Sequence, residues 1–218
     1  MMIKMDCSQY FNYLDEAAQV IREQKDYITE LDAAIADGDH WLNITIGFDK
    51  LLQLRESLTC AQDFKEFFKN LAMAVMSAMG GTSGALYGSA YLAAAKAFGG
   101  IRYLDADHIG KMLTCWSEAL MKRGNTKPGD KTMVDAVYPA AAAYNLALSQ
   151  GRNCRESLLI MKEKAQEGAE STREMEAAKG RASNQPGKGV GHLDPGAVTM
   201  AIQLGCLADY LIKHCLER

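Results

Sequence analysis

The stretch FKEFFKNLAMAVMSA, residues 64–78, spaces its apolar side chains as a helix does. These residues recur after three or four positions, which places them on one face of an α-helix. A half-buried strand would instead alternate apolar and polar residues with a period of two. The stretch therefore predicts an amphipathic helix whose buried stripe consists of Phe64, Phe68, Leu71, Val75 and Ala78.

The same spacing recurs along most of the chain. Clusters of Val, Ile and Thr, which favour strands, are missing, and alanine-rich segments such as YPAAAAYNLAL (138–148) favour helix. We therefore predict an all-α fold, an antiparallel bundle of long helices, in one domain spanning residues 1–218. The other apolar stripes are formed by Phe11, Leu14, Ala18 and Ile21, by Ile28, Leu31 and Ile35, and by Ile109, Leu113, Trp116 and Leu120.

Composition excludes several classes of protein. The net charge of −3 and the absence of a long basic run give no electrostatic footprint for nucleic acid. The chain has no uninterrupted apolar run of about 18 residues and no signal-peptide pattern, so we expect a cytoplasmic protein without a membrane span. The 6 cysteines include no C-x-x-C pair, which argues against a zinc site and favours small core residues.

Polar, glycine-rich turns separate the predicted helices. In an antiparallel bundle some of these turns fall at the same end, where they can converge on a site. The last turn finishes with Asp194 and Pro195, an N-cap residue and a first-turn proline, which predict a final helix to about Lys213. The four turns are ADGDH (36–40), MGGTSGALYG (79–88), KRGNTKPGDKTM (122–133) and GRASNQPGKGVGHLDPG (180–196).

Three aspartates crowd the first of these turns. Asp37 and Asp39 flank Gly38, so both carboxylates can turn toward one point, and Asp32 precedes Asp37 by about one and a half helical turns. Carboxylate oxygens without nearby thiols suit a hard cation such as Mg²⁺. The alternative is that the aspartates cap a helix, face solvent or form an ordinary turn. Their crowding beside His40 favours the metal site.

Two other turns offer phosphate-binding features. Thr82 and Ser83 stand among glycines at a predicted helix start, where unpaired N–H groups can bind a phosphate, although small residues there can also serve a close helix contact. Arg181 lies in a glycine-rich loop that can close over a ligand, or that can be an ordinary surface loop. Neither segment has the G-x-x-x-x-G-K-[ST] pattern of a P-loop.

Four motifs taken in order resemble one known family. DGDHWLN (37–43), GGTSGALYG (80–88), PGDKTMVDA (128–136) and GRASNQPGKGVGHLDPGA (180–197) resemble the nucleotide-binding L subunit of dihydroxyacetone kinase, the DhaL-type domain. The resemblance covers essentially the whole chain. It implies a barrel of eight antiparallel helices that holds ADP or ATP at one end through two Mg²⁺ ions.

The resemblance also assigns roles to residues. It implies that Asp32, Asp37 and Asp39 bind the metals, and our hypothesis for the mechanism is that Arg181 stabilises the transferred phosphoryl group. The family usually has a small residue where this chain has Trp41, which can pack beside the nucleotide or narrow the site. The positions implied to contact the nucleotide are His40, Trp41, Leu42, Asn43, Thr82, Ser83, Gly124, Met133, Arg181, Asp194, Pro195 and Gly196.

Partners follow from the resemblance as well. It implies a separate K subunit, which carries dihydroxyacetone, and an M subunit of the phosphotransferase system, which rephosphorylates bound ADP. The alternatives are an ATP-dependent kinase subunit for another ketose, an L-like nucleotide sensor that binds a transcription regulator, and a Mg²⁺-dependent phosphohydrolase. The nucleotide sensor would use the same metal and phosphate residues.

Overall fold

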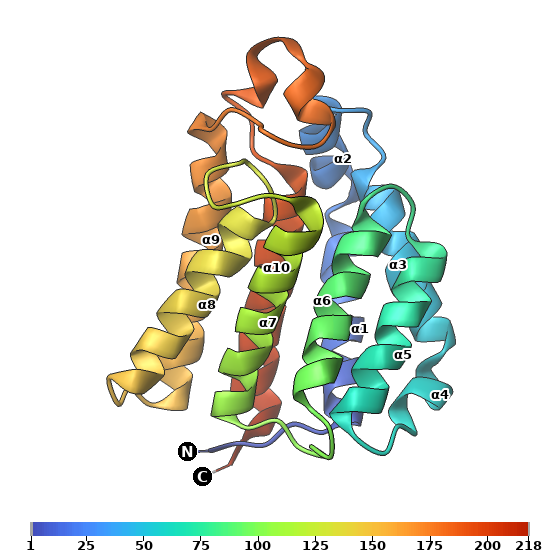
Figure 1. Cartoon of the computed structure of the whole chain (residues 1–218), viewed down its shortest axis with the longest axis vertical. Helices are drawn as coiled ribbons and strands as arrows, with labels where there is room; N and C mark the ends of the chain where they lie inside the picture. Colours follow the sequence, from blue (N-terminus) through green and yellow to red (C-terminus); the bar gives the residue numbers. More distant parts are fainter. Residues whose placement is uncertain (1, 218) are drawn as a thin grey trace.

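The computed structural model describes residues 2–217 and is almost entirely helical (Figure 1). Eight helices of 14 to 19 residues form the body of the molecule. They are α1 (Cys7–Glu23), α3 (His40–Gln53), α5 (Phe64–Ala78), α6 (Ser83–Ala97), α7 (Ala106–Gly124), α8 (Val134–Ser149), α9 (Cys154–Ser171) and α10 (Pro195–Tyr210). The all-α prediction is confirmed.

Short elements complete the described chain. Two short helices, α2 (Lys25–Ala33) and α4 (Arg55–Thr59), follow α1 and α3 after single-residue breaks, so the described residues contain ten α-helices rather than eight. Strands β1 (Met2–Ile3) and β2 (Leu216–Glu217) pair antiparallel and join the two ends. The remaining turns are η1 (Thr172–Glu174), η2 (Arg181–Asn184), η3 (Pro186–Gly189) and the π-helical η4 (Leu211–Cys215).

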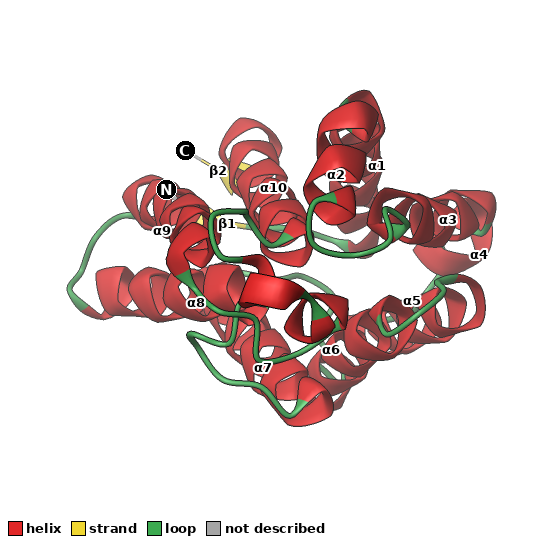
Figure 2. Cartoon of the chain, turned by 90° about the horizontal axis from the view of Figure 1, so that it is seen from above, coloured by secondary structure: helices red, strands yellow, loops and turns green. Residues whose placement is uncertain are grey.

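The long helices pack in a closed order. From α5 to α10 each helix packs against the next along the chain, α10 returns to α1, and α1 and α5 both pack against α3 (Figure 2). The apolar stripes face the interior of this ring. Tyr10 of α1 meets Phe67 and Phe68 of α5 with ring centroids 5.5 and 5.2 Å apart, so the stripe predicted in residues 64–78 forms part of the core.

Aspartate and asparagine caps fix where several helices begin. Asp63 accepts from the N–H of Glu66 at 2.9 Å, and Asp194 accepts from the N–H of Ala197 at 2.7 Å. Each cap satisfies an N–H that lacks a partner in the first helical turn. The predicted start of the final helix at Asp194-Pro195 is therefore confirmed.

The segment Pro195–Cys215 is long and apolar enough to cross a membrane by length and composition, with a mean hydropathy of 1.3. The sequence expectation concerned an uninterrupted apolar run, and Gln203, Asp209 and Lys213 interrupt this segment. Moreover, 72% of the apolar window is buried inside the protein, where α10 packs against α1, α8 and α9. A core helix of a soluble bundle has the same composition.

The four predicted turns lie at one end of the bundle. In Figure 1 this is the upper end, where the loop between α9 and α10 arches over α2 and the starts of α3 and α6. The sequence predicted that some of the turns converge, and residues from all four line a common cavity at this end.

Candidate functional site

The three predicted metal-binding aspartates come together. One carboxylate oxygen from each of Asp32, Asp37 and Asp39 lies within 4.8 Å of the others. Asp32 is buried near the end of α2, and Gly38 adopts a φ of +76° that turns the chain between the other two. The backbone N–H of His40 donates to Asp32 at 3.1 Å and fixes that carboxylate. Such a set of oxygens can hold a hard divalent cation.

Arg181 stands over these acids. Its guanidinium forms an ion pair with Asp37 and lies 3.3 Å from Asp39. All three side chains are about half exposed, so the pairs are screened by water and contribute little to folding stability. An arginine in this position can exchange its carboxylate partners for phosphate oxygens when a cation occupies the acids.

His40 lies beside the acids, and its Nε2 is 2.9 Å from the hydroxyl of Thr199. That hydroxyl donates to the carbonyl of Pro195 at 3.0 Å, so it accepts from the histidine and assigns the ring hydrogen to Nε2. Burial lowers the pKa of His40 below its ordinary value, while Asp32 opposes this effect. The ring is therefore neutral at pH 7.

The start of α6 faces the same cavity. Thr82 and Ser83 line it, and Thr82 makes no side-chain cap, so the N–H groups of the first turn are not satisfied by a cap. Gly84 serves close packing, since a Cβ there would lie 2.7 Å from the carbonyl oxygen of Met79 and 3.2 Å from that of Val75. A helix start with uncapped N–H groups and a close helix contact, the features behind the two alternatives in the sequence, therefore occur together in the first turn of α6.

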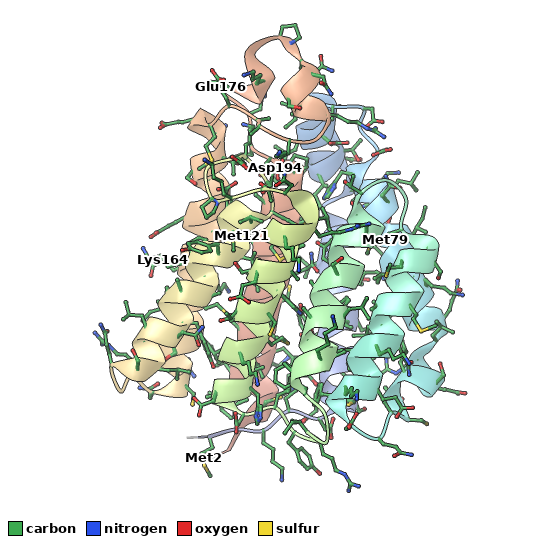
Figure 3. All side chains as sticks on the ribbon, in the orientation of Figure 1. Met2, Met79, Met121, Lys164, Glu176 and Asp194 are labelled. Atoms are coloured by element: carbon green, nitrogen blue, oxygen red, sulfur yellow. The ribbon has the colours of Figure 1, made fainter. Side chains whose placement is uncertain are left out.

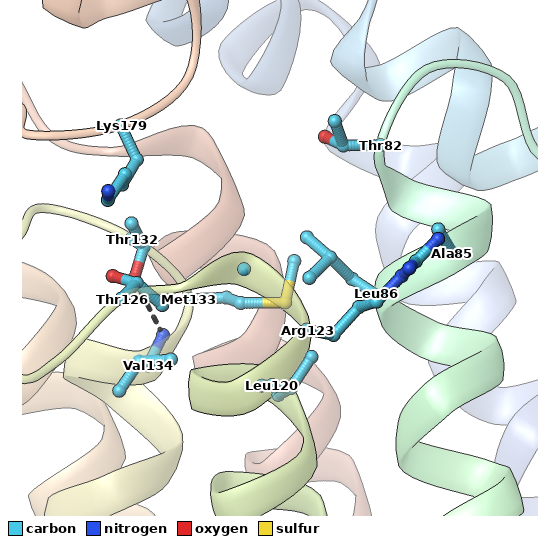
Figure 4. A pocket seen from close by; sticks show the side chains of 11 residues that line it. Thr82, Ala85, Leu86, Leu120, Arg123, Thr126, Thr132, Met133, Val134 and Lys179 are labelled. Carbon is cyan, nitrogen blue, oxygen red and sulfur yellow. Dashed lines mark hydrogen bonds between the residues drawn. The ribbon is translucent and has the colours of Figure 1, made fainter.

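Two adjoining cavities make up the site. The first, of about 200 Å³, contains the aspartates, Arg181 and the starts of α3, α6 and α10. The second, of about 300 Å³, is mainly apolar, with Leu86 and Met133 pointing toward each other across it (Figure 4). The residues that line both cavities are Thr82, Leu86, Thr132, Met133 and Lys179.

Most predicted nucleotide contacts line these cavities. His40, Asn43, Thr82, Ser83, Met133, Arg181, Asp194, Pro195 and Gly196 line the first, and Gly124 lines the second. Trp41 and Leu42 line neither. The indole N–H of Trp41 donates to the carbonyl of Ile21 at 3.0 Å, which holds the ring against the end of α1. Trp41 therefore neither packs beside the cavity nor narrows it, and Leu42 faces solvent.

Two lysines at the site were not singled out in the sequence. Lys179 lines both cavities, next to the predicted loop 180–196. Lys131 lines the first cavity and is only 1% exposed. Its position within the PGDKTM motif was the available signal, but nothing local indicates that its ammonium is buried.

Asp194 lies where the loops meet at the end of the bundle (Figure 3). Besides capping α10, its backbone N–H donates to the hydroxyl of Thr172 at 2.9 Å. Burial raises the pKa of Asp194 to about 7, although the Ala197 N–H and Lys131 favour the charged form. Folding therefore favours the protonated acid, and this contribution to stability is lost as the pH rises from the acid's ordinary pKa through about 7.

Replacing Asp194 with Asn is expected to make the nucleotide-free protein relatively more stable at high pH. Asn keeps an oxygen that can cap α10 but has no charge to bury. The variant's free energy of unfolding, relative to the unmodified protein, is expected to rise by about 2 kcal/mol between pH 5 and pH 8. Urea denaturation in EDTA at both pH values measures this change. An equal difference at the two pH values would contradict the raised pKa.

Comparisons with known proteins identify the family. The DAK2 domain matches residues 34–209. The chain is 31% identical over 201 residues to the "PEP-dependent dihydroxyacetone kinase, ADP-binding subunit DhaL" of Escherichia coli strain K12, covering 92% of this chain and 95% of that protein. It is 35% identical over 205 residues to the "PTS-dependent dihydroxyacetone kinase, ADP-binding subunit DhaL" of Lactococcus lactis, covering 94% of each.

A solved structure has the same fold. The dihydroxyacetone kinase from C. freundii in complex with AMP-PNP and Mg²⁺ matches with a TM-score of 0.68 at 22% identity, over 91% of this chain and 33% of that chain. At this identity the likeness shows the fold alone. The resemblance predicted from the four motifs is confirmed by the family match and the two relatives, and the chain therefore belongs to the DAK2 domain family.

Proposed function

We propose that this chain is the nucleotide-binding subunit of a dihydroxyacetone kinase, with ADP as a bound coenzyme that is rephosphorylated by a phosphotransferase-system protein. One observation carries the proposal. Three carboxylates within 4.8 Å of one another face Arg181 in a cavity that adjoins an apolar one. The names of the Escherichia coli and Lactococcus lactis relatives support the coenzyme version.

Asp32, Asp37 and Asp39 would hold Mg²⁺, two ions by resemblance to the family. Bound Mg²⁺ supplies neutralisation of negative charge on phosphate oxygens. The donor set fits this ion, because it offers only carboxylate oxygens and because Asp37 and Asp39 remain accessible to a phosphate.

The phosphates would lie among three helix starts. His40, Ser83 and Pro195 begin α3, α6 and α10, and all three line the first cavity. The positive ends of three helix dipoles therefore face the position of the phosphates, and Arg181 adds a full positive charge. Phosphoryl transfer depends mainly on such positioning and charge stabilisation, so no protein nucleophile is required.

The adenine would lie in the second cavity. Leu120, Met133 and Val134 give it an apolar lining. Gly124, the last residue of α7, forms part of its wall without a side chain. A flat aromatic base suits such a lining. The residues shared by the two cavities would then contact the ribose and the first phosphate.

The acceptor would be presented by another protein. Both relatives are described as ADP-binding subunits, which supports a partner K subunit carrying dihydroxyacetone and an M subunit as phosphoryl donor. This chain would then supply the nucleotide and the electrostatic environment of the transfer. The partner would supply the hydroxyl that accepts the phosphoryl group.

The purified protein is expected to retain ADP. Metal-bridged phosphates and an enclosed base should dissociate slowly, so native mass spectrometry after dialysis in Mg²⁺ should find one ADP per chain. With a K subunit and a phosphorylated M subunit, the protein should then form dihydroxyacetone phosphate from dihydroxyacetone. An empty chain that works only with free ATP would contradict the coenzyme version. If dihydroxyacetone phosphate formed neither with the phosphorylated M subunit nor with free ATP, the kinase assignment would be contradicted.

A further inference from the structure

Lys131 has an unusual environment for a lysine at a phosphate-binding site. Its side chain is only 1% exposed, and its backbone adopts a left-handed φ of +60°. The ammonium donates to the carbonyl oxygens of Thr172, Gly189 and His192, at 2.6, 2.8 and 2.5 Å. An ammonium has three hydrogens, so all of them are used within the protein and none is left for a phosphate.

The three carbonyls belong to the segment that carries Arg181. Thr172 begins this segment and His192 ends it, so one ammonium ties its two ends together at the base. We call residues 172–192 the arginine loop. Further backbone hydrogen bonds close the same base, since the N–H of Gly191 donates to the carbonyl of Arg173 at 2.7 Å and that of Ala178 donates to the carbonyl of Asp130 at 3.1 Å.

The tethered part of the arginine loop packs directly against Ile35, which precedes the turn of residues 36–40. A Cβ on Gly189 would lie 3.1 Å from Ile35 and 3.2 Å from Lys131, so the loop backbone packs tightly against both. Ile35 lies between Asp32 and Asp37 in sequence. It forms a small buried cluster with Ala177 and Ala182, the latter adjacent to Arg181. The arginine loop thus packs against Lys131 on one side and, through Ile35, against the segment that carries the aspartates.

We infer that Lys131 is a positioning residue for phosphoryl transfer, which ties the arginine loop down so that Arg181 stays over Asp37 and Asp39. The inference rests on the proposed function for its catalytic consequence only. A lysine in such a site would ordinarily be assigned to a phosphate, as a direct electrostatic ligand. The saturation of its three donors by loop carbonyls favours the tether.

Proteolysis tests the tether without reference to activity. Lys131→Met keeps the length of the side chain but removes the ammonium, so the arginine loop should open more often. Cleavage by thermolysin within residues 172–192 is expected to become at least about ten-fold faster, because proteolysis follows the population of the open form. Lys188→Gln is the control, since Lys188 lies in the same loop but is half exposed and pairs with Glu176, and glutamine adds no apolar cleavage site for thermolysin. Unchanged cleavage in Lys131→Met would overturn the inference.

A second variant leaves Lys131 in place. Gly189 has a φ of +72°, and the methyl group of Gly189→Ala would press on Lys131 and Ile35. This variant should expose the arginine loop to thermolysin in the same way, with the helical circular dichroism signal unchanged. A Gly189→Ala protein as resistant as the unmodified one would contradict the close packing on which the inference depends.

Coupling to Arg181 separates a tether from a phosphate ligand. If Lys131 acts through Arg181, Lys131→Met should lower kcat about ten-fold in the unmodified background and less than two-fold in an Arg181→Ala background. A lysine that binds phosphate itself would lower kcat by the same factor in both. If the unmodified protein transfers no phosphoryl group, the proposed function fails, whereas the proteolysis result still decides whether Lys131 tethers the loop.

Discussion

Replacing Asp37 with Asn is expected to weaken ADP binding in the presence of Mg²⁺ by about 100-fold or more, the upper end of what loss of an outer-shell partner costs a metal site. Asp37 would be a direct ligand, and an uncharged amide is a poorer ligand for Mg²⁺ than a carboxylate. The double variant Asp37→Asn/Asp39→Asn should lose Mg²⁺-dependent binding entirely. The fold should persist, because both side chains are about half exposed and lie in a turn that Gly38 shapes.

Calorimetric titration with ADP, with and without Mg²⁺, measures this effect, and circular dichroism checks the helicity. Asp49→Asn is the matched control, since Asp49 is an exposed carboxylate of α3 that pairs with Arg22 outside both cavities. In EDTA the double variant should bind ADP no more weakly than the unmodified protein, because two charges that repel phosphate have been removed. Undiminished affinity in Mg²⁺ would exclude the aspartates as the metal site.

Periodicity predicted the long helices because each has one buried face. It did not predict the two breaks that separate α1 from α2 and α3 from α4. Neither Gln24 nor Leu54, the residues at these breaks, is a glycine or proline. Local propensity therefore favours a continuous helix at both places. At the first break, the indole N–H of Trp41 donates to the carbonyl of Ile21 near the end of α1, a contact that local propensity does not predict.

The candidate site was predictable where its residues are close in sequence. Asp32, Asp37 and Asp39 lie within eight positions, so their convergence follows from helical geometry and one glycine turn. Lys131 is different, because the carbonyls that it contacts are 41 to 61 residues away. A residue whose partners are supplied by a distant loop gives no local signal of its role.

The direction of side chains was a second feature of the site that the sequence did not predict. The resemblance placed His40 to Asn43 together at the nucleotide. Successive helical residues, however, point about 100° apart, so four in a row cannot all face one cavity. His40 and Asn43 face the site, whereas Trp41 turns to α1 and Leu42 to solvent.

Arg181→Ala is expected to change metal binding and phosphoryl transfer in opposite directions. In the structure the guanidinium pairs with Asp37 and Asp39, so Mg²⁺ bound to these acids would displace it. Because exposed pairs contribute about 1 kcal/mol at most, the variant should bind Mg²⁺ up to about five-fold more tightly. Transfer should nevertheless fall by about 100-fold or more, since the group that stabilises charge on the phosphoryl oxygens is gone.

Calorimetry with Mg²⁺ alone and steady-state transfer with saturating partner subunits measure the two effects separately. Arg181→Lys keeps the charge but loses the two-pronged geometry of the guanidinium, so its transfer rate should lie between those of the unmodified protein and Arg181→Ala. Arg152→Ala removes an exposed arginine that pairs with Glu156 outside both cavities and should change neither quantity. If Arg181→Ala weakened Mg²⁺ binding and transfer together, the arginine would be holding the acids in place. The catalytic role proposed for it would then have to be given up.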